Sequence, residues 1–202
     1  MFWAACNIAY LGFLHSAKFT VPNMASYSPA IHLGLADIAF ASHYSPSCLC
    51  IRIKELKTDP FCKGCFVYIG KGYFPLCVIQ SLLAYLSVMG DPSGPLFLFR
   101  DGWPLSRAIL SSWLHHILSS AGIDGNFSSH SFRIGAATVS ARNRIADHQI
   151  QTLGRWTSNL FNISTNSSGG VIKTFEAADV CCSLIFATRL LWFTSGFEDF
   201  VQ

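Results

Sequence analysis

A histidine and an arginine lie three residues apart where the sequence predicts the start of a helix. His130 and Arg133 occur in the run His-Ser-Phe-Arg-Ile-Gly-Ala-Ala-Thr, and Ser128 and Ser129 can cap that helix. Positions three apart share a helix face, so both side chains should point the same way. An arginine fork, a histidine donor and the positive end of a helix dipole suit an anionic oxygen. Taken alone, a His-x-x-Arg pair is explained at least as well by structural pairing.

The elements that must position this pair are predicted to be mostly helical. The apolar spacing predicts helices within 1–19, from Pro75 to Gly90, from Pro104 to Gly122, from Ser128 or Ser129 to about Arg142, and from Asp147 to just before Gly154. Alternating or β-branched runs at 48–54 and 66–69 predict a hairpin with Lys57 near its turn. The expected fold class is therefore mainly α with a small antiparallel β-sheet.

Composition limits the class of protein without giving its substrate. The 202 residues are 51% hydrophobic and 12% charged, which is enough apolar material for one sizeable core. A net charge of +3 is compatible with a nucleic-acid partner but is too small to argue for one. The eight cysteines are irregularly placed and no basic leader precedes an apolar stretch, which favours a reducing compartment.

Four of the cysteines raise the question of a metal. Cys48 and Cys50, with Cys62 and Cys65, offer four thiolates that could hold zinc if the intervening segment folds back. Cys-x-Cys is a poor half-site, however, and buried free cysteine is common. The histidines show no metal-ligand spacing. We therefore expect no metal.

Further motifs place the His-x-x-Arg pair in a wider pattern. Upstream are Lys57-Thr-Asp-Pro-Phe61, then Gly94-Pro-Leu-Phe97 with Asp101-Gly-Trp-Pro-Leu105, and downstream is Leu153-Gly-Arg-Trp156. In this order the motifs resemble the catalytic domain of tyrosine recombinases, particularly those of eukaryotic transposable elements. The resemblance implies a recombinase-like catalytic domain over 1–163, without the family's N-terminal core-binding domain, and a linker with a non-matching apolar tail over 164–202.

The resemblance also implies roles for individual residues. Such enzymes attack a DNA phosphodiester with a tyrosine hydroxyl, while two arginines and a histidine hold the phosphate oxygens and a hairpin lysine protonates the leaving oxygen. Arg133 matches the second arginine, His130 the histidine, and Lys57 the lysine. Trp156 falls where the family has histidine or tryptophan, and its indole can donate one N–H.

The same resemblance implies the partners. We expect double-stranded DNA, no metal, no cofactor and no small-molecule ligand. Since family members act as tetramers on two DNA sites, a homo-oligomer on DNA is implied, as are roles in DNA recombination and DNA integration. A DNA substrate implies a nuclear or intracellular location.

Two positions depart from the family pattern. His15 stands at the first arginine, with Lys18 where an acidic residue should follow. Histidine cannot reproduce the bidentate fork of arginine and is largely neutral near pH 7. Ser164 stands where the tyrosine is expected, and no tyrosine follows Tyr85. Because a serine hydroxyl is shorter and is a poor nucleophile without a base, we expect no DNA cleavage.

Other interpretations stay open at this point. The hairpin cations Arg52, Lys54, Lys63 and Lys71 could face phosphates or simply keep an exposed ribbon soluble. The whole chain could be a non-catalytic remnant that holds DNA or a protein partner. The apolar segment 180–197 could anchor a membrane protein, although Arg189 near its centre would cost several kcal/mol. The tail could also be drifted or misread sequence without a selected fold.

Overall fold

The computed structural model describes residues 1–41, 45–55, 64–73, 76–90 and 93–156. Lys57, Cys62, Lys63, Pro75, Ser164 and the tail lie outside these residues, so the predictions made for them stay predictions. The described helices are α1 (Phe2–Leu11), α2 (Val78–Met89), α3 (Arg107–Ser120), α4 (Ser131–Arg142) and α5 (Asp147–Gly154). With a three-stranded antiparallel sheet, they confirm the predicted fold class.

The sheet contains the predicted hairpin and one strand that the sequence pattern did not indicate. β2 (Cys48–Ile53) pairs with β3 (Cys65–Gly70), with Arg52 opposite Phe66 and Cys50 opposite Tyr68. The three-residue β1 (Ile38–Phe40) adds to the other edge of β2. Such a short strand offers too few residues for alternation to be visible in the sequence.

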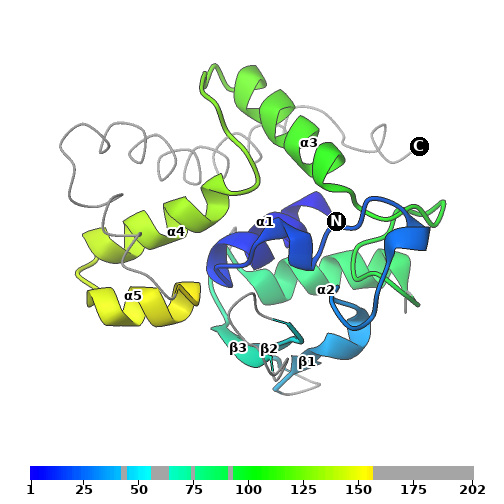
Figure 1. Cartoon of the computed structure of the whole chain (residues 1–202), viewed down its shortest axis with the longest axis horizontal. Coiled ribbons are helices and arrows are strands. Elements are labelled where there is room, and N and C mark those ends of the chain that lie inside the picture. Colours follow the sequence, from blue (N-terminus) through cyan, green and yellow to red (C-terminus); the bar gives the residue numbers. More distant parts are fainter. Residues whose placement is uncertain (42–44, 56–63, 74–75, 91–92, 157–202) are drawn as a thin grey trace.

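Helix α1 lies at the centre of the molecule (Figure 1), where it contacts α2 and α4. Its small residues Ala4, Ala5 and Ala9 are buried, so neighbouring backbones can approach closely. The inner face of the sheet joins the same core through fully buried or nearly buried side chains, namely Leu49, Ile51, Ile53 and Ile69. α3 lies on the side of α1 away from the sheet (Figure 1).

The N-terminal segment is not one helix through Phe19, as the apolar spacing predicted. α1 ends at Leu11, Phe13 takes a left-handed backbone conformation with φ of 51°, and a 3₁₀ turn, η1, follows over Ser16–Lys18. A phenylalanine in that conformation interrupts the helix whatever the apolar pattern around it. His15 therefore lies at the start of η1 and not on a helix.

Three other helix starts also differ from the prediction. α2 begins at Val78, after the non-helical residues Leu76 and Cys77, and Gly90 ends it as expected. α3 begins at Arg107 and not at Pro104, because the Ser106 hydroxyl caps it by accepting from Ile109 N–H at 3.2 Å. α4 begins at Ser131 without a side-chain cap, and α5 includes both Asp147 and Gly154.

The described residues contain neither a membrane-spanning helix nor a metal-ligating cluster. No helix there is both long enough and apolar enough to cross a membrane. No group of three or more histidine, cysteine, aspartate or glutamate side chains is placed to hold a metal ion in those same ranges. The thiols of Cys48, Cys50 and Cys65 are free.

Candidate functional site

The segment before α4 and the turn η1 come together although more than a hundred residues separate them. The ring centroids of His15 and His130 are 6.2 Å apart. Next to each histidine, the hydroxyls of Ser16 and Ser129 share a buried hydrogen bond of 2.8 Å. This buried bond fixes the two histidines relative to each other, since breaking it would leave buried hydroxyls without a partner.

Arg133 lies in the first turn of α4 and is held from two directions. Its guanidinium donates a hydrogen bond to the carbonyl oxygen of Gly154, and its Cζ lies 4.6 Å from the centre of the Trp156 ring. The Nε group is buried and has no hydrogen-bond partner among the described residues. A buried donor without an acceptor is unusual in a folded protein, and it leaves part of the charge of this guanidinium uncompensated.

The charge of Arg133 persists at neutral pH. Burial, and to a lesser degree the positive charge of Arg155, lower the pKa of Arg133 to about 10. The guanidinium therefore stays protonated, with part of its hydration removed. Such a group interacts more strongly with a phosphate than a fully solvated one does.

Trp156 forms the platform under Arg133. Its ring also packs edge-on against Phe13, with centroids 6.3 Å apart, in a small cluster that includes Ile150. A Cβ atom added to Gly154 would collide with this ring. Glycine at 154 thus lets the tryptophan fold back beneath the arginine. The role of the indole N–H as a phosphate donor stays a prediction.

The side chain of His130 is exposed at the edge of this site. Partial desolvation, followed by the positive charges of Arg133 and Arg107, lowers the pKa of His130 below its usual 6.5. Arg107, at the start of α3, thereby joins the electrostatic environment of the site. No local pattern in the sequence connects Arg107 with His130.

His15 caps the turn η1 through one of its two ring nitrogens. Its Nδ1 accepts a hydrogen bond of 3.2 Å from the Ala17 N–H, so in the neutral ring the proton is carried by Nε2. An N–H group at that position can donate to one oxygen. It cannot form the two parallel bonds of an arginine fork.

Arg155, within the Leu-Gly-Arg-Trp motif, forms structural hydrogen bonds that the sequence did not predict. It donates to the carbonyl oxygens of Gly12 and Phe13 at 2.8 and 2.9 Å, and so ties the end of α5 to the end of α1. Its backbone is left-handed, with φ of 55°. Its acceptors lie 143 and 142 residues away, which no local pattern reveals.

The hairpin base is held by ion pairs. Lys54 Nζ lies 2.5 Å from the Asp37 carboxylate and also donates to the carbonyl oxygens of Pro29 and His32. The alternative in which Lys54 faces phosphates is therefore wrong, because its charge is already paired. Lys18 lies 3.6 Å from Glu55, the last described residue before the segment with Lys57.

Comparison with known proteins identifies the fold. No protein-family model matches the sequence, and no match to a curated protein was found. Two solved structures of XerH site-specific recombinase match at a TM-score of 0.57 each: a pre-cleavage complex with difH substrate (19% identity) and a post-cleavage complex with palindromic difH substrate (18%). This chain has a tyrosine recombinase-like fold.

The match covers most of this chain but less than half of either neighbour. It includes 81% and 82% of this chain against 42% and 41% of the XerH chains. Within this fold, His130, Arg133, Trp156 and His15 are brought together. The position of Lys57 relative to them lies outside the described residues. The site can bind an anion, because it brings together the guanidinium of Arg133 and the imidazoles of His15 and His130. The positive charge of Arg107 lies nearby.

Proposed function

We propose that this recombinase- and integrase-like domain binds double-stranded DNA at the site formed by His15, His130, Arg133 and Trp156, and that it does not cleave the strand. The observation that carries the proposal is the guanidinium of Arg133. It is held in place by Gly154 and Trp156, yet its Nε has no partner among the described residues. A backbone phosphate offers acceptor oxygens that suit this group.

The surrounding charges support an anionic ligand. Partial desolvation, followed by the positive charges of Arg133 and Arg107, lowers the pKa of His130 and so disfavours its protonation in the free protein. A phosphate beside it would reverse that effect and favour the imidazolium. The fold supports DNA as the source of the phosphate, because the two XerH structures are complexes with a difH substrate.

The absence of cleavage is proposed from the residue types. His15 supplies one donor where a tyrosine recombinase has an arginine fork, and removing one such oxyanion donor typically costs about 2.7–4 kcal/mol of transition-state stabilisation. Ser164 stands at the expected tyrosine, and its hydroxyl is a weak nucleophile. We accordingly regard this domain as a pseudoenzyme derived from the DNA recombination and integration machinery of a transposable element.

Duplex binding is tested by fluorescence anisotropy with a labelled duplex at several salt concentrations. We expect Arg133→Gln to weaken binding about tenfold or more, because it removes a phosphate contact and leaves the Gly154 carbonyl without its donor. Arg142→Gln is the matched control, since Arg142 is an exposed arginine in the last turn of the same helix. Equal losses in the two variants would contradict a specific role for Arg133.

A further inference from the structure

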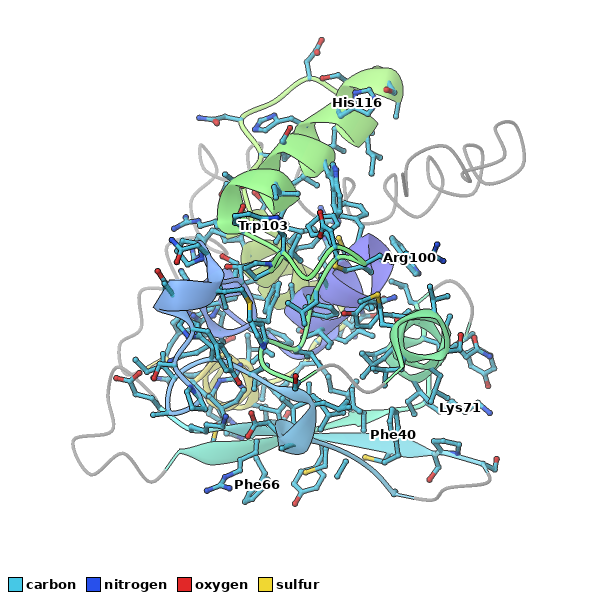
Figure 2. All side chains as sticks on the ribbon, turned by 90° about the vertical axis from the view of Figure 1, so that its right-hand side faces the viewer. Phe40, Phe66, Lys71, Arg100, Trp103 and His116 are labelled. Atoms are coloured by element: carbon cyan, nitrogen blue, oxygen red, sulfur yellow. The ribbon has the colours of Figure 1, made fainter. Side chains whose placement is uncertain are left out.

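The outer face of the β-sheet carries two aromatic rings that no other part of the described structure covers. We define the outer sheet face by Ala39, Cys48, Cys50, Arg52, Phe66 and Tyr68. Phe66 is 60% exposed and Tyr68 is 70% exposed. Figure 2 shows Phe66 pointing away from the body of the molecule. Exposing two large rings side by side costs solubility, so it indicates a binding role.

The strand register determines how these side chains are arranged. Phe66 and Tyr68 are two residues apart on β3, so they share a face and lie about 6.8 Å apart along the strand. Arg52 is directly opposite Phe66 on β2, and Cys50 is directly opposite Tyr68. The face therefore presents two successive aromatic rings with a guanidinium beside the first.

The charge on and around this face is positive. Arg52 is exposed, and Lys71 is exposed just beyond the end of β3. Neither has an ion-pair partner within the described ranges. The two carboxylates next to the sheet are already paired, Asp37 with Lys54 and Glu55 with Lys18. The described strand positions of the face contribute no acidic side chain. An anionic ligand is thus favoured.

We propose that the outer sheet face binds single-stranded nucleic acid, with bases stacked on Phe66 and Tyr68 and with Arg52 and Lys71 contacting the backbone phosphates. Aromatic rings beside a basic strip are the pattern by which proteins bind unpaired strands without sequence preference. A duplex cannot use these rings in the same way, since its base faces are already stacked on one another.

This site is separate from the one proposed for duplex DNA. The inner face of the sheet packs into the core with α1, so the outer face points away from it. The duplex-binding proposal rests on Arg133 and His130, and neither residue belongs to the outer sheet face. Failure of one proposal therefore leaves the other unaffected, and each has its own variants.

The test is fluorescence anisotropy of the full chain with a labelled twelve-nucleotide oligothymidine, with unlabelled duplex as competitor. Phe66→Ala and Tyr68→Ala should each weaken single-strand binding about tenfold, since one stacked base is lost. Tyr68→Phe keeps the ring and should bind like the original chain. Arg52→Gln should reduce the salt slope by about 0.7, the contribution of one phosphate on a single strand.

Tyr73→Ala is the matched control, because Tyr73 is 91% exposed but lies beyond the end of β3. It should leave binding unchanged. The proposal is overturned if the oligonucleotide does not bind at low salt, or if Phe66→Ala and Tyr68→Ala bind like the original chain. It is also overturned if Tyr73→Ala weakens binding as much, or if Phe66→Ala converts a dimer to a monomer, which would make the face an interface between copies.

Discussion

The guanidinium of Arg133 combines rigidity with an unused donor. The Gly154 carbonyl and the Trp156 ring limit its rotation, so little entropy is lost when an anion binds. The neighbouring His130 adds sensitivity to pH, because partial desolvation and the charges of Arg133 and Arg107 keep its pKa below 6.5. Affinity at this site should therefore depend both on geometry and on protonation.

The pH dependence of duplex binding follows from His130. A phosphate favours the imidazolium, so the pKa of His130 is higher in the complex than in the free chain, and binding takes up a proton. The affinity should then rise as the pH falls through the pKa of the complex and level off below the lowered pKa of the free chain, with a total gain of about tenfold for each unit of difference between the two pKa values. Anisotropy titrations between pH 5.5 and 8 measure this. His130→Asn should flatten the curve, and an unchanged curve in that variant would argue against proton uptake at His130.

Glycine at 154 is required by the position of Trp156. Gly154→Ala places a Cβ atom against the indole, so the ring must move and Arg133 loses its platform. We expect the free energy of unfolding in urea to fall by about 1–3 kcal/mol, as for other overpacked sites, and duplex affinity to fall with it. Gly70→Ala is the control, because a Cβ there meets nothing within 4 Å. If Gly154→Ala matches the original chain in stability and binding, the platform is not needed.

At the scale of elements, the site depends on how α5 is joined to α1. Arg155 bonds two carbonyl oxygens beyond the end of α1, and Ser16 bonds Ser129 across to the start of α4. These contacts position Trp156 and both histidines. A few hydrogen bonds between residues far apart in the sequence thus determine the geometry of the site.

Removing the hydrogen bonds of Arg155 should lower the free energy of unfolding, because they join the end of α5 to the end of α1. Arg155→Gln loses the donors to Gly12 and Phe13, and hydrogen bonds from a charged group typically contribute about 1.5–3 kcal/mol. Urea unfolding should show a loss of that size. Arg144→Gln is the matched control, since Arg144 is also an arginine with a left-handed backbone, at φ of 60°, and is exposed. Similar losses in both variants would show that the left-handed conformation, and not the carbonyl bonds, determines the effect.

The elements that follow from local pattern were predictable from sequence, whereas those set by distant partners were not. The hairpin, the end of α2 at Gly90 and the existence of all five described helices followed from periodicity and glycine placement. The break at Phe13 and the tasks of Arg155 and Lys54 did not, because their partners are far away along the chain. Within the site, motif order singled out His130, Arg133, Trp156 and His15, while Arg107 joined them only through the fold.

At the scale of the whole molecule, a tyrosine recombinase-like fold carries the proposed anion site, in which histidine stands at the first arginine position of the family pattern and serine at the expected tyrosine. The fold and the altered residues together lead to the central claim. The domain should hold duplex DNA in the manner of a recombinase and leave both strands intact. Assembly of several copies on DNA and the role of Lys57 stay predictions.

One experiment tests this claim most directly. The full chain is incubated at low salt with a labelled duplex that carries a nick, and the same reaction is analysed on a native gel and, after denaturation, on a denaturing gel. We predict a shifted complex on the native gel, weakened by Arg133→Gln, and no covalent protein–DNA adduct on the denaturing gel. The absence of any duplex complex, or an adduct that maps to Ser164, would contradict the account.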